Sequence, residues 1–199
     1  MKKLALLFPI VCLVLFTSAA HADTLTFDND PTGEIGPYTL TLNTIQLSLF
    51  CMNDQNFIQG NESWGVNVIN GASFFGSASG SAGFKYEEEA YIYSQYDGTN
   101  ATDVQDALWT IFDPTTTNTD AMSPELVQDA ANFNGYSMQF LSATTFYLWD
   151  GGSITNQYGD YAPQNFLGAS PVPEPSSLVF LGTGFIGLAG ILHLRLTRS

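Results

Sequence analysis

The sequence predicts an α+β fold, in which a single small domain of antiparallel β-strands carries two or three helices inserted mid-chain. A C-terminal transmembrane helix is expected after this domain. Two observations predict the domain. Apolar and polar residues alternate in the first third of the chain, as they do in half-buried strands. The spacing then becomes helical in the middle of the chain and returns to that of strands near residue 140.

The N-terminal segment, residues 1–22, is predicted to be a secretory signal peptide. Two lysines precede an apolar run, and a small-residue cleavage site ends at Ala22. The apolar run is short for a membrane-spanning helix and ends in small and polar residues. The mature chain is therefore expected outside the cytoplasm. Cys12 is removed with the signal, so Cys51 is the cysteine that remains.

The segment from Thr39 to Phe50 is predicted to be a strand, because it is rich in β-branched and apolar residues with period-two alternation. One face of this strand is expected to point into the core, and it carries Ile45, Leu47, Leu49 and Cys51. The segment from Trp64 to Phe75 is predicted to form one or two further strands. A flexible connector is expected over residues 76–83, which are mostly small.

The first and third helices are predicted from the residues near their N-termini. The first is expected over residues 86–93, with three glutamates, 87–89, in its first turns, where the helix dipole favours acids. The third is expected to begin at Ser123, a capping residue that is followed by proline. A strand is expected from Phe140 to Trp149.

The second helix is predicted to run from an N-cap at Thr102 to a stop near Asp113 and Pro114. Its spacing gives two faces. The face expected to point outward carries Asp103, Asp106, Thr110 and Asp113, and the inward face carries Val104, Leu108, Ile111 and Phe112. Gln105 precedes Leu108 and Trp109 by three and four positions, so it borders the buried face.

The domain between the two end segments, residues 23–170, is strongly acidic. Lys85 is its one basic residue, against eighteen of the nineteen acids in the chain. Nucleic acid and anionic membrane surfaces are therefore disfavoured as partners of this domain. The domain also lacks histidine, since His21 and His193 lie in the end segments. This excludes histidine-dependent nucleophilic catalysis and histidine zinc sites. We expect no metal, no cofactor and no enzyme with turnover.

The C-terminal segment, residues 171–199, combines three features in order. The motif Val172, Pro173, Glu174 and Pro175 precedes an apolar stretch from Leu178 to Leu194, which Arg195 and Arg198 follow. The apolar stretch is about as long as the minimum for crossing a bilayer. The two arginines are expected to stay on the membrane's inner side, which leaves the domain outside.

This segment resembles the PEP-CTERM sorting signal of Gram-negative, exopolysaccharide-forming bacteria. The resemblance implies that an exosortase recognises the motif and that the inner membrane holds the precursor by its sorting helix before processing. It also implies delivery to the cell surface or the extracellular matrix. The signal is an address, so it does not define the activity of the domain.

Cys51 and Gln105 are the candidate functional residues of the domain. Each has an ordinary structural interpretation when taken alone. A free cysteine packs in a core as a small hydrophobic residue, and a glutamine beside a buried face can bond to backbone. The sequences around the two residues favour a second interpretation.

The segments Phe50-Cys51-Met52-Asn53 and Val104-Gln105-Asp106-Ala107-Leu108-Trp109 resemble the paired motifs of the thioester domains of Gram-positive surface adhesins. The resemblance implies a bond between the Cys51 sulfur and the Gln105 side-chain carbonyl carbon. The surroundings it implies for this bond are Phe50, Asn53, Leu108 and Trp109. Such a pair would attach the protein covalently to a surface or a polymer. Both an inert Cys51 and a thioester stay open.

Three classes of function follow. The first is an adhesin-like surface protein with the thioester. The second is a non-covalent protein of the biofilm or exopolysaccharide matrix, or a carbohydrate-binding module. Its stacking surfaces, if exposed, would be Tyr91, Tyr93, Tyr96, Tyr158 and Tyr161. The third, an ice-binding protein, is disfavoured because the sequence has no flat, repetitive threonine array.

Overall fold

A computed structural model describes residues 23–29, 35–54, 58–115, 123–133, 135, 138–152, 154–156 and 159–170. The chain divides into two units, residues 1–169 and 170–199, and every described helix and strand belongs to the first. The expected signal peptide, the sorting motif and the transmembrane helix lie outside the described residues. None of the helices that the structure describes is long and apolar enough to cross a membrane.

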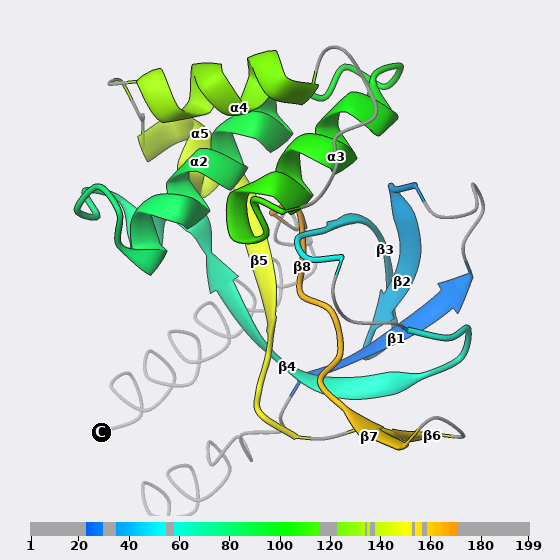
Figure 1. The fold of residues 1–199 in the computed structure, drawn as a ribbon. Helices are drawn as coiled ribbons and strands as arrows, with labels where there is room; N and C mark the ends of the chain where they lie inside the picture. Colours follow the sequence, from blue (N-terminus) through cyan, green and yellow to red (C-terminus); the bar gives the residue numbers. More distant parts are fainter. Residues whose placement is uncertain are drawn as a thin grey trace, which may run out of the picture. The chain divides into compact units, whose positions relative to one another are not determined.

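Six strands close into an antiparallel barrel in the order β1-β2-β3-β8-β5-β4 (Figure 1). These strands are β1 (Asp23–Asn29), β2 (Tyr38–Leu42), β3 (Ile45–Cys51), β4 (Ser63–Asn70), β5 (Thr144–Trp149) and β8 (Phe166–Ala169). A separate hairpin pairs β6 (Ile154–Asn156) with β7 (Gly159–Tyr161). Neighbouring strands are antiparallel throughout the barrel, as the sequence predicted.

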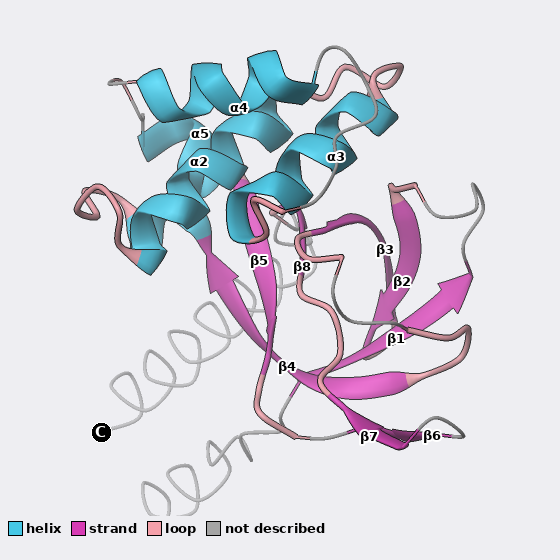
Figure 2. Cartoon of the chain, in the orientation of Figure 1, coloured by secondary structure: helices cyan, strands magenta, loops and turns pink. Residues whose placement is uncertain are grey.

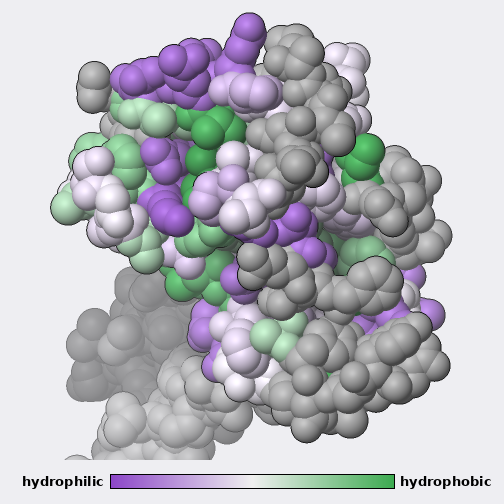
Figure 3. Space-filling model, viewed as in Figure 1, coloured by the Kyte–Doolittle hydropathy of each residue, from purple (hydrophilic) through white to green (hydrophobic). Residues whose placement is uncertain are grey.

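The helices form one continuous insertion between β4 and β5 and gather on one side of the barrel (Figure 2). They are the 3-10 helix η1 (Gly71–Phe74), α2 (Ala82–Ser94), α3 (Ala101–Phe112), α4 (Ser123–Asn132) and the short α5 (Met138–Ser142). The outer side of α4 presents a hydrophilic surface (Figure 3). This arrangement confirms the α+β class with helices inserted mid-chain.

Side-chain alternation gives the strands next to the helices two buried faces. Cys51, Tyr147 and Phe166 belong to the core inside the barrel. Their chain neighbours Phe50, Phe146 and Leu167 belong to a second core, between the barrel wall and the helices. A strand buried on both sides loses the simple in-and-out pattern of polarity. For this reason Phe50 and Cys51 are both fully buried although they point in opposite directions.

Three predicted strand boundaries were wrong. The strand expected from Thr39 to Phe50 is a hairpin of β2 and β3, with a turn at Asn43, whose φ of 55° asparagine tolerates better than most residues. The strand expected to run to Phe75 ends at Asn70, where the asparagine side chain caps η1. The strand expected from Phe140 begins at Thr144, after α5. A turn and a helix cap thus ended the strand in the first two cases, and a short helix delayed its start in the third.

The predicted position of the three glutamates in α2 was also wrong. Ser81 caps the helix by accepting a hydrogen bond from the Phe84 amide, so α2 begins at Ala82. The glutamates therefore lie in the middle of the helix rather than in its first turn. Glu87 is 2% exposed and Glu89 is fully buried, because α2 packs against both α3 and α4.

Helix α3 follows the prediction with two differences. It begins at Ala101 with Asn100 in the N-cap position, instead of with a cap at Thr102. Asp106, expected to point outward, is only 7% exposed because α4 also packs against this helix. Gln105 is fully buried rather than at the border of the apolar face. The start of α4 at Ser123 agrees with the prediction.

Candidate functional site

Cys51 is the last residue of β3, which lies between β2 and β8 in the barrel. On the β8 side Cys51 pairs with Phe166. The partner strand β2 pairs with β3 only as far as Tyr38, which lies opposite Leu49. Continuing that register would place Gly36 opposite Cys51, but the chain has left the sheet there. The backbone of Cys51 therefore lacks a strand partner on the β2 side.

The side chain of Gln105 fills this place. Its Nε2 donates to the Cys51 carbonyl oxygen at 2.6 Å, and its Oε1 accepts from the Cys51 amide at 3.2 Å. The carboxamide thus makes the pair of hydrogen bonds that an antiparallel strand would make. Both residues are fully buried, and they are 54 positions apart in sequence. The structure therefore brings together the two residues that the sequence predicted as a pair.

Gly36 makes room for the Gln105 carboxamide. A Cβ atom at this position would lie 2.6 Å from the Gln105 Oε1 and 3.1 Å from the Phe50 ring. That approach is too close for a side chain unless the glutamine moves. Gly36 is thus a residue of the site that sequence reasoning missed, because nothing local marks it as the position opposite Cys51.

The thiol of Cys51 is held in its protonated form. Its Sγ donates a hydrogen bond to the Asn53 carbonyl oxygen at 2.9 Å. Burial raises the pKa of this thiol to about 12, although the Trp109 indole and the Asn53 backbone act to lower it. The indole Nε1 of Trp109 itself makes no hydrogen bond of ordinary geometry. At neutral pH the sulfur is therefore a poor nucleophile unless a neighbouring group removes its proton.

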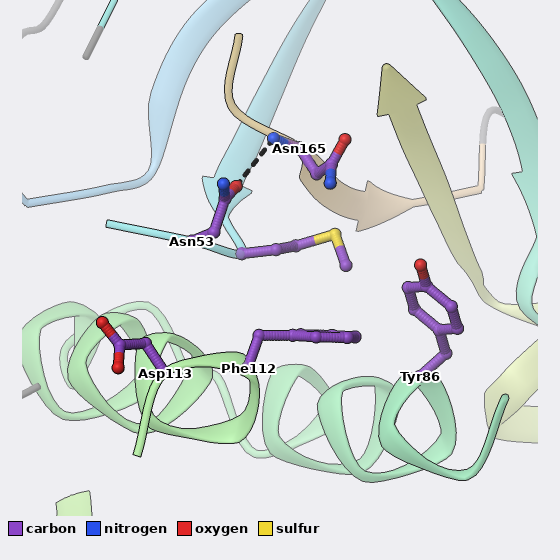
Figure 4. Close-up of a pocket in the computed structure, with 6 residues that line it drawn as sticks. Asn53, Tyr86, Phe112, Asp113 and Asn165 are labelled. Atoms are coloured by element: carbon purple, nitrogen blue, oxygen red, sulfur yellow. Dashed lines mark hydrogen bonds between the residues drawn. The ribbon is translucent and has the colours of Figure 1, made fainter. Parts of the chain in front are cut away.

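Asn53 and Asn165 fix the chain that follows Cys51. The Asn165 amide donates to the Asn53 Oδ1 at 2.9 Å (Figure 4), and the Met52 amide donates to the Asn165 carbonyl oxygen at 2.9 Å. The Asn165 Oδ1 accepts from the Trp149 amide at 2.8 Å. Asn53 was predicted as a site residue, whereas Asn165 was not, because it lies 112 positions away from Asn53.

The other predicted surroundings divide between the two cores. Phe50 packs edge-on against Tyr96 and Tyr93 in the helical core, with ring centroids 4.9 Å and 6.0 Å away. Leu108 is fully buried in the same core. Trp109 instead packs against the barrel core, which contains Cys51. Apolar groups therefore surround the Cys51 and Gln105 pair from both sides.

A cavity of about 200 Å³ opens beside the segment that follows Cys51. Figure 4 shows Asn53 and Asn165 on one side of it, with Tyr86, Phe112 and Asp113 extending from the helices on the other. Its lining residues are Met52, Asn53, Tyr86, Phe112, Asp113 and Asn165. The Lys85 Nζ lies 5.1 Å from the centroid of the Phe112 ring. The cavity is large enough for a small polar group to approach this end of β3.

The tyrosines that were considered for carbohydrate stacking and that the structure describes are packed against other rings and partly buried. Tyr93 and Tyr96 pack against Phe50, and the Tyr91 ring is stacked on Phe133 at 4.5 Å. Tyr158 and the side chain of Tyr161 lie outside the described residues. Within the part of the chain that the structure describes, no cluster of three or more histidine, cysteine, aspartate or glutamate side chains is arranged to hold a metal ion.

The C-terminal prediction is confirmed by comparison with known families. Residues 171–195 match the model of the PEP-CTERM protein-sorting motif. The chain is therefore an exported protein that is anchored in the membrane before exosortase processing and then lies at the cell surface. Neither the curated proteins nor the solved structures gave a match to this chain.

Proposed function

We propose that this exosortase-processed surface protein attaches covalently to a surface or extracellular polymer through an internal thioester between Cys51 and Gln105. One observation carries the proposal. The Gln105 carboxamide is held against Cys51 by two hydrogen bonds, at 2.6 Å and 3.2 Å, in a fully buried site. Both bonds are to the Cys51 backbone, so they place the carboxamide beside the residue that carries the sulfur. Such placement replaces an encounter in solution by an intramolecular step.

Formation of the thioester is a transfer of the Gln105 acyl group. The Cys51 sulfur bonds to the Gln105 Cδ, the bond from Cδ to Nε2 breaks, and the thiol proton leaves with the nitrogen as ammonia. An incoming amine or hydroxyl later attacks Cδ, and the sulfur departs as the thiol. The product is an amide or ester through Gln105. The acyl group is consumed, so each molecule reacts once.

The surroundings of the pair support a stored thioester. The sulfur lies in the barrel core, and Phe50 and Leu108 pack behind it in the helical core. Exclusion of water from both sides would slow hydrolysis of the activated acyl group. The cavity lined by Asn53, Phe112 and Asp113 lies next to the chain that follows Cys51. An acceptor group would approach from this side and would need a local opening, because Cys51 and Gln105 are themselves fully buried.

The test is the intact mass of the mature domain, residues 23–170. The wild-type protein should be lighter by one ammonia than its sequence requires. The deficit should vanish in Cys51→Ala and in Gln105→Ala, and it should persist in Gln128→Ala, which alters an exposed glutamine. Methylamine should add covalently at Gln105. A full mass in freshly prepared wild-type protein, with a thiol that alkylates after denaturation, would exclude the thioester.

A second candidate function is non-covalent binding of a matrix carbohydrate. The cavity favours it, because it combines the rings of Tyr86 and Phe112 with the polar side chains of Asn53, Asp113 and Asn165. Aromatic rings beside hydroxyl-binding groups are a suitable lining for a sugar ring. Titration calorimetry with neutral oligosaccharides should then show binding that Phe112→Ala abolishes and Cys51→Ala leaves unchanged. If Cys51→Ala abolishes retention on the polymer, this candidate is excluded.

A further inference from the structure

The barrel has two distinct ends, because neighbouring strands alternate in direction around it. One end, which we call the exit end, combines the starts of β1, β3 and β5 with the ends of β2, β4 and β8. The chain leaves the described strands there, since β8 ends at Ala169. Cys51 is the last residue of β3, so it lies at the opposite end of the barrel.

The exit end is nearly free of charged side chains. The strand starts and strand ends that meet there, apart from the start of β1, belong to stretches of sequence without any charged residue, and these stretches are residues 35–53, 63–84, 130–149 and 161–173. Among the described strand ends and turns of the exit end, Asp23 is the one acid. Its carboxylate accepts a hydrogen bond from the Asn43 side chain at 2.9 Å.

The opposite end of the barrel is acidic. Four acids lie within the last two residues of a strand or directly beside a strand end there, and they are Asp28, Asp54, Glu62 and Asp150. Strands of this length separate the two ends by roughly 10–20 Å. Salt screens the repulsion between exposed charges beyond about 8 Å at physiological ionic strength. A surface that touches the exit end is therefore shielded from these four acids.

The large hydrophobic side chains that the described residues expose all come from the uncharged stretches. They are Ile45, Val68, Phe75 and Met138, with exposed fractions between 37% and 50%. Ile45 begins β3, and Val68 lies two residues before the end of β4. Phe75 directly follows η1 and Met138 begins α5, and these two helices pack against each other and against β5. Uncharged surface with exposed apolar side chains is typical of an interaction site.

A short connection joins the exit end to the part of the chain that the membrane holds. The match to the sorting motif begins at residue 171, two positions after β8 ends at Ala169. Residues 170–178 connect Ala169 to Leu178, where the predicted membrane span begins. Nine residues cover at most about 30 Å when fully extended. In the anchored precursor the connection therefore limits the distance between the exit end and the lipid.

We propose that the exit end of the barrel rests on the phospholipid surface while the precursor is anchored. The acidic domain as a whole is repelled by anionic lipid, since Lys85 faces eighteen acids. The exit end is the part of the barrel that approaches the lipid with one acid and with exposed apolar side chains. This orientation places Cys51 at the barrel end that points away from the membrane. The inference does not depend on the thioester.

The experiment measures which positions of the anchored precursor lie near lipid. Residues 23–199 in the Cys51→Ala background are placed in nanodiscs of phosphatidylcholine and phosphatidylglycerol that contain a lipid with a nitroxide headgroup. A fluorophore is attached to Ile45→Cys or Met138→Cys. The matched controls are Ser63→Cys, exposed at the opposite end of the barrel, and Gln128→Cys, exposed on α4. The nitroxide should quench the first two probes several-fold more strongly than the two controls.

A second pair of variants tests the role of charge. Phe75→Asp/Met138→Asp adds two acids beside the exit end and should weaken the quenching of the Ile45→Cys probe. Ser63→Asp/Gln128→Asp adds two acids elsewhere and should leave it unchanged.

Three results would overturn the proposal. Equal quenching at all four probe positions would show that the domain has no preferred orientation. Unchanged quenching in Phe75→Asp/Met138→Asp would show that this surface does not touch the lipid. Quenching of the Ile45→Cys probe that requires an exosortase in the nanodisc would assign the exit end to the enzyme rather than to the phospholipid.

Discussion

The Gln105 side chain pairs with the Cys51 backbone as a neighbouring strand would, with hydrogen bonds of 2.6 Å and 3.2 Å. This relationship has a structural and a chemical consequence. It satisfies the backbone of a fully buried residue where β2 leaves the sheet. It also holds next to Cys51 the carboxamide that the proposed thioester would use. Variants of the two residues and of their neighbours separate these consequences.

Loss of the Gln105 side chain should destabilise the domain even where no thioester can form. Comparing Cys51→Ala with the double variant Cys51→Ala/Gln105→Ala isolates the structural effect. The double variant should lose about 2–4 kcal/mol in the free energy of unfolding, because two buried backbone groups become unpaired. Urea denaturation measures this difference. Gln128→Ala in the same background, at an exposed position, should change stability by less than about 0.5 kcal/mol.

Adding a methyl group at Gly36 should disturb the pair from the opposite side. The Cβ of Gly36→Ala would lie 2.6 Å from the Gln105 Oε1, so the carboxamide must shift. We expect the free energy of unfolding to fall by about 1–3 kcal/mol. We also expect a smaller fraction of molecules to show the mass deficit of one ammonia that marks the thioester. Gly60→Ala is the matched control, since a Cβ there meets nothing within 4 Å. Equal masses and equal unfolding midpoints in Gly36→Ala and wild type would contradict the observed packing.

The Cys51 thiol should be unreactive in folded protein that cannot form the thioester, such as Gln105→Met. Because burial raises the thiol pKa to about 12, only about one thiol in 10⁴ is ionised at pH 8. Alkylation by iodoacetamide should therefore be slow at pH 8 and should accelerate as the pH rises toward 12. Mass spectrometry after timed alkylation checks this. In urea the same thiol should react quickly, and rapid alkylation of the folded protein would contradict the prediction.

Removing the Asn53 side chain should loosen the segment that follows Cys51. Asn53→Ala leaves the Asn165 amide without the acceptor that it has at 2.9 Å. The expected loss is about 1 kcal/mol in the free energy of unfolding. Asn67→Ala, on the exposed side of β4, serves as the control. Faster hydrogen exchange over residues 51–54 in Asn53→Ala, but not in Asn67→Ala, would assign the effect to this segment.

Glu89 should make the domain less stable as the pH rises. Burial raises its folded-state pKa above its unfolded value, so folding favours the protonated form. Its contribution is fully present below the unfolded pKa of about 4.5 and is lost as the pH rises through the folded pKa. Glu89→Met should therefore be more stable than wild type at pH 7, and the difference should shrink toward pH 4. Parallel stability curves for the two proteins, measured from pH 4 to pH 8, would contradict this.

The amino-acid sequence by itself determined the features that depend on local order. The sorting motif at residues 171–195 is contiguous, so it could be recognised without a fold. The class of the domain followed from changes in hydrophobic period, and the start of α4 followed from the serine and proline at its N-terminus. Short motifs around Cys51 and Gln105 also predicted these two residues as a pair, and in the structure the Gln105 side chain bonds to the Cys51 backbone.

Tertiary structure decided what depends on which segments pack together. Strands buried on both faces hide their period, so the closure of the barrel and the pairing of β3 with β8 could not be read from polarity. The cap at Ser81 starts α2 earlier than predicted, so Glu89 lies in the middle of the helix instead of in its first turns, and it is fully buried there. Gly36 and Asn165 join the site through strand register and packing across long sequence separations. Only the folded chain places these two residues beside the segment that contains Cys51.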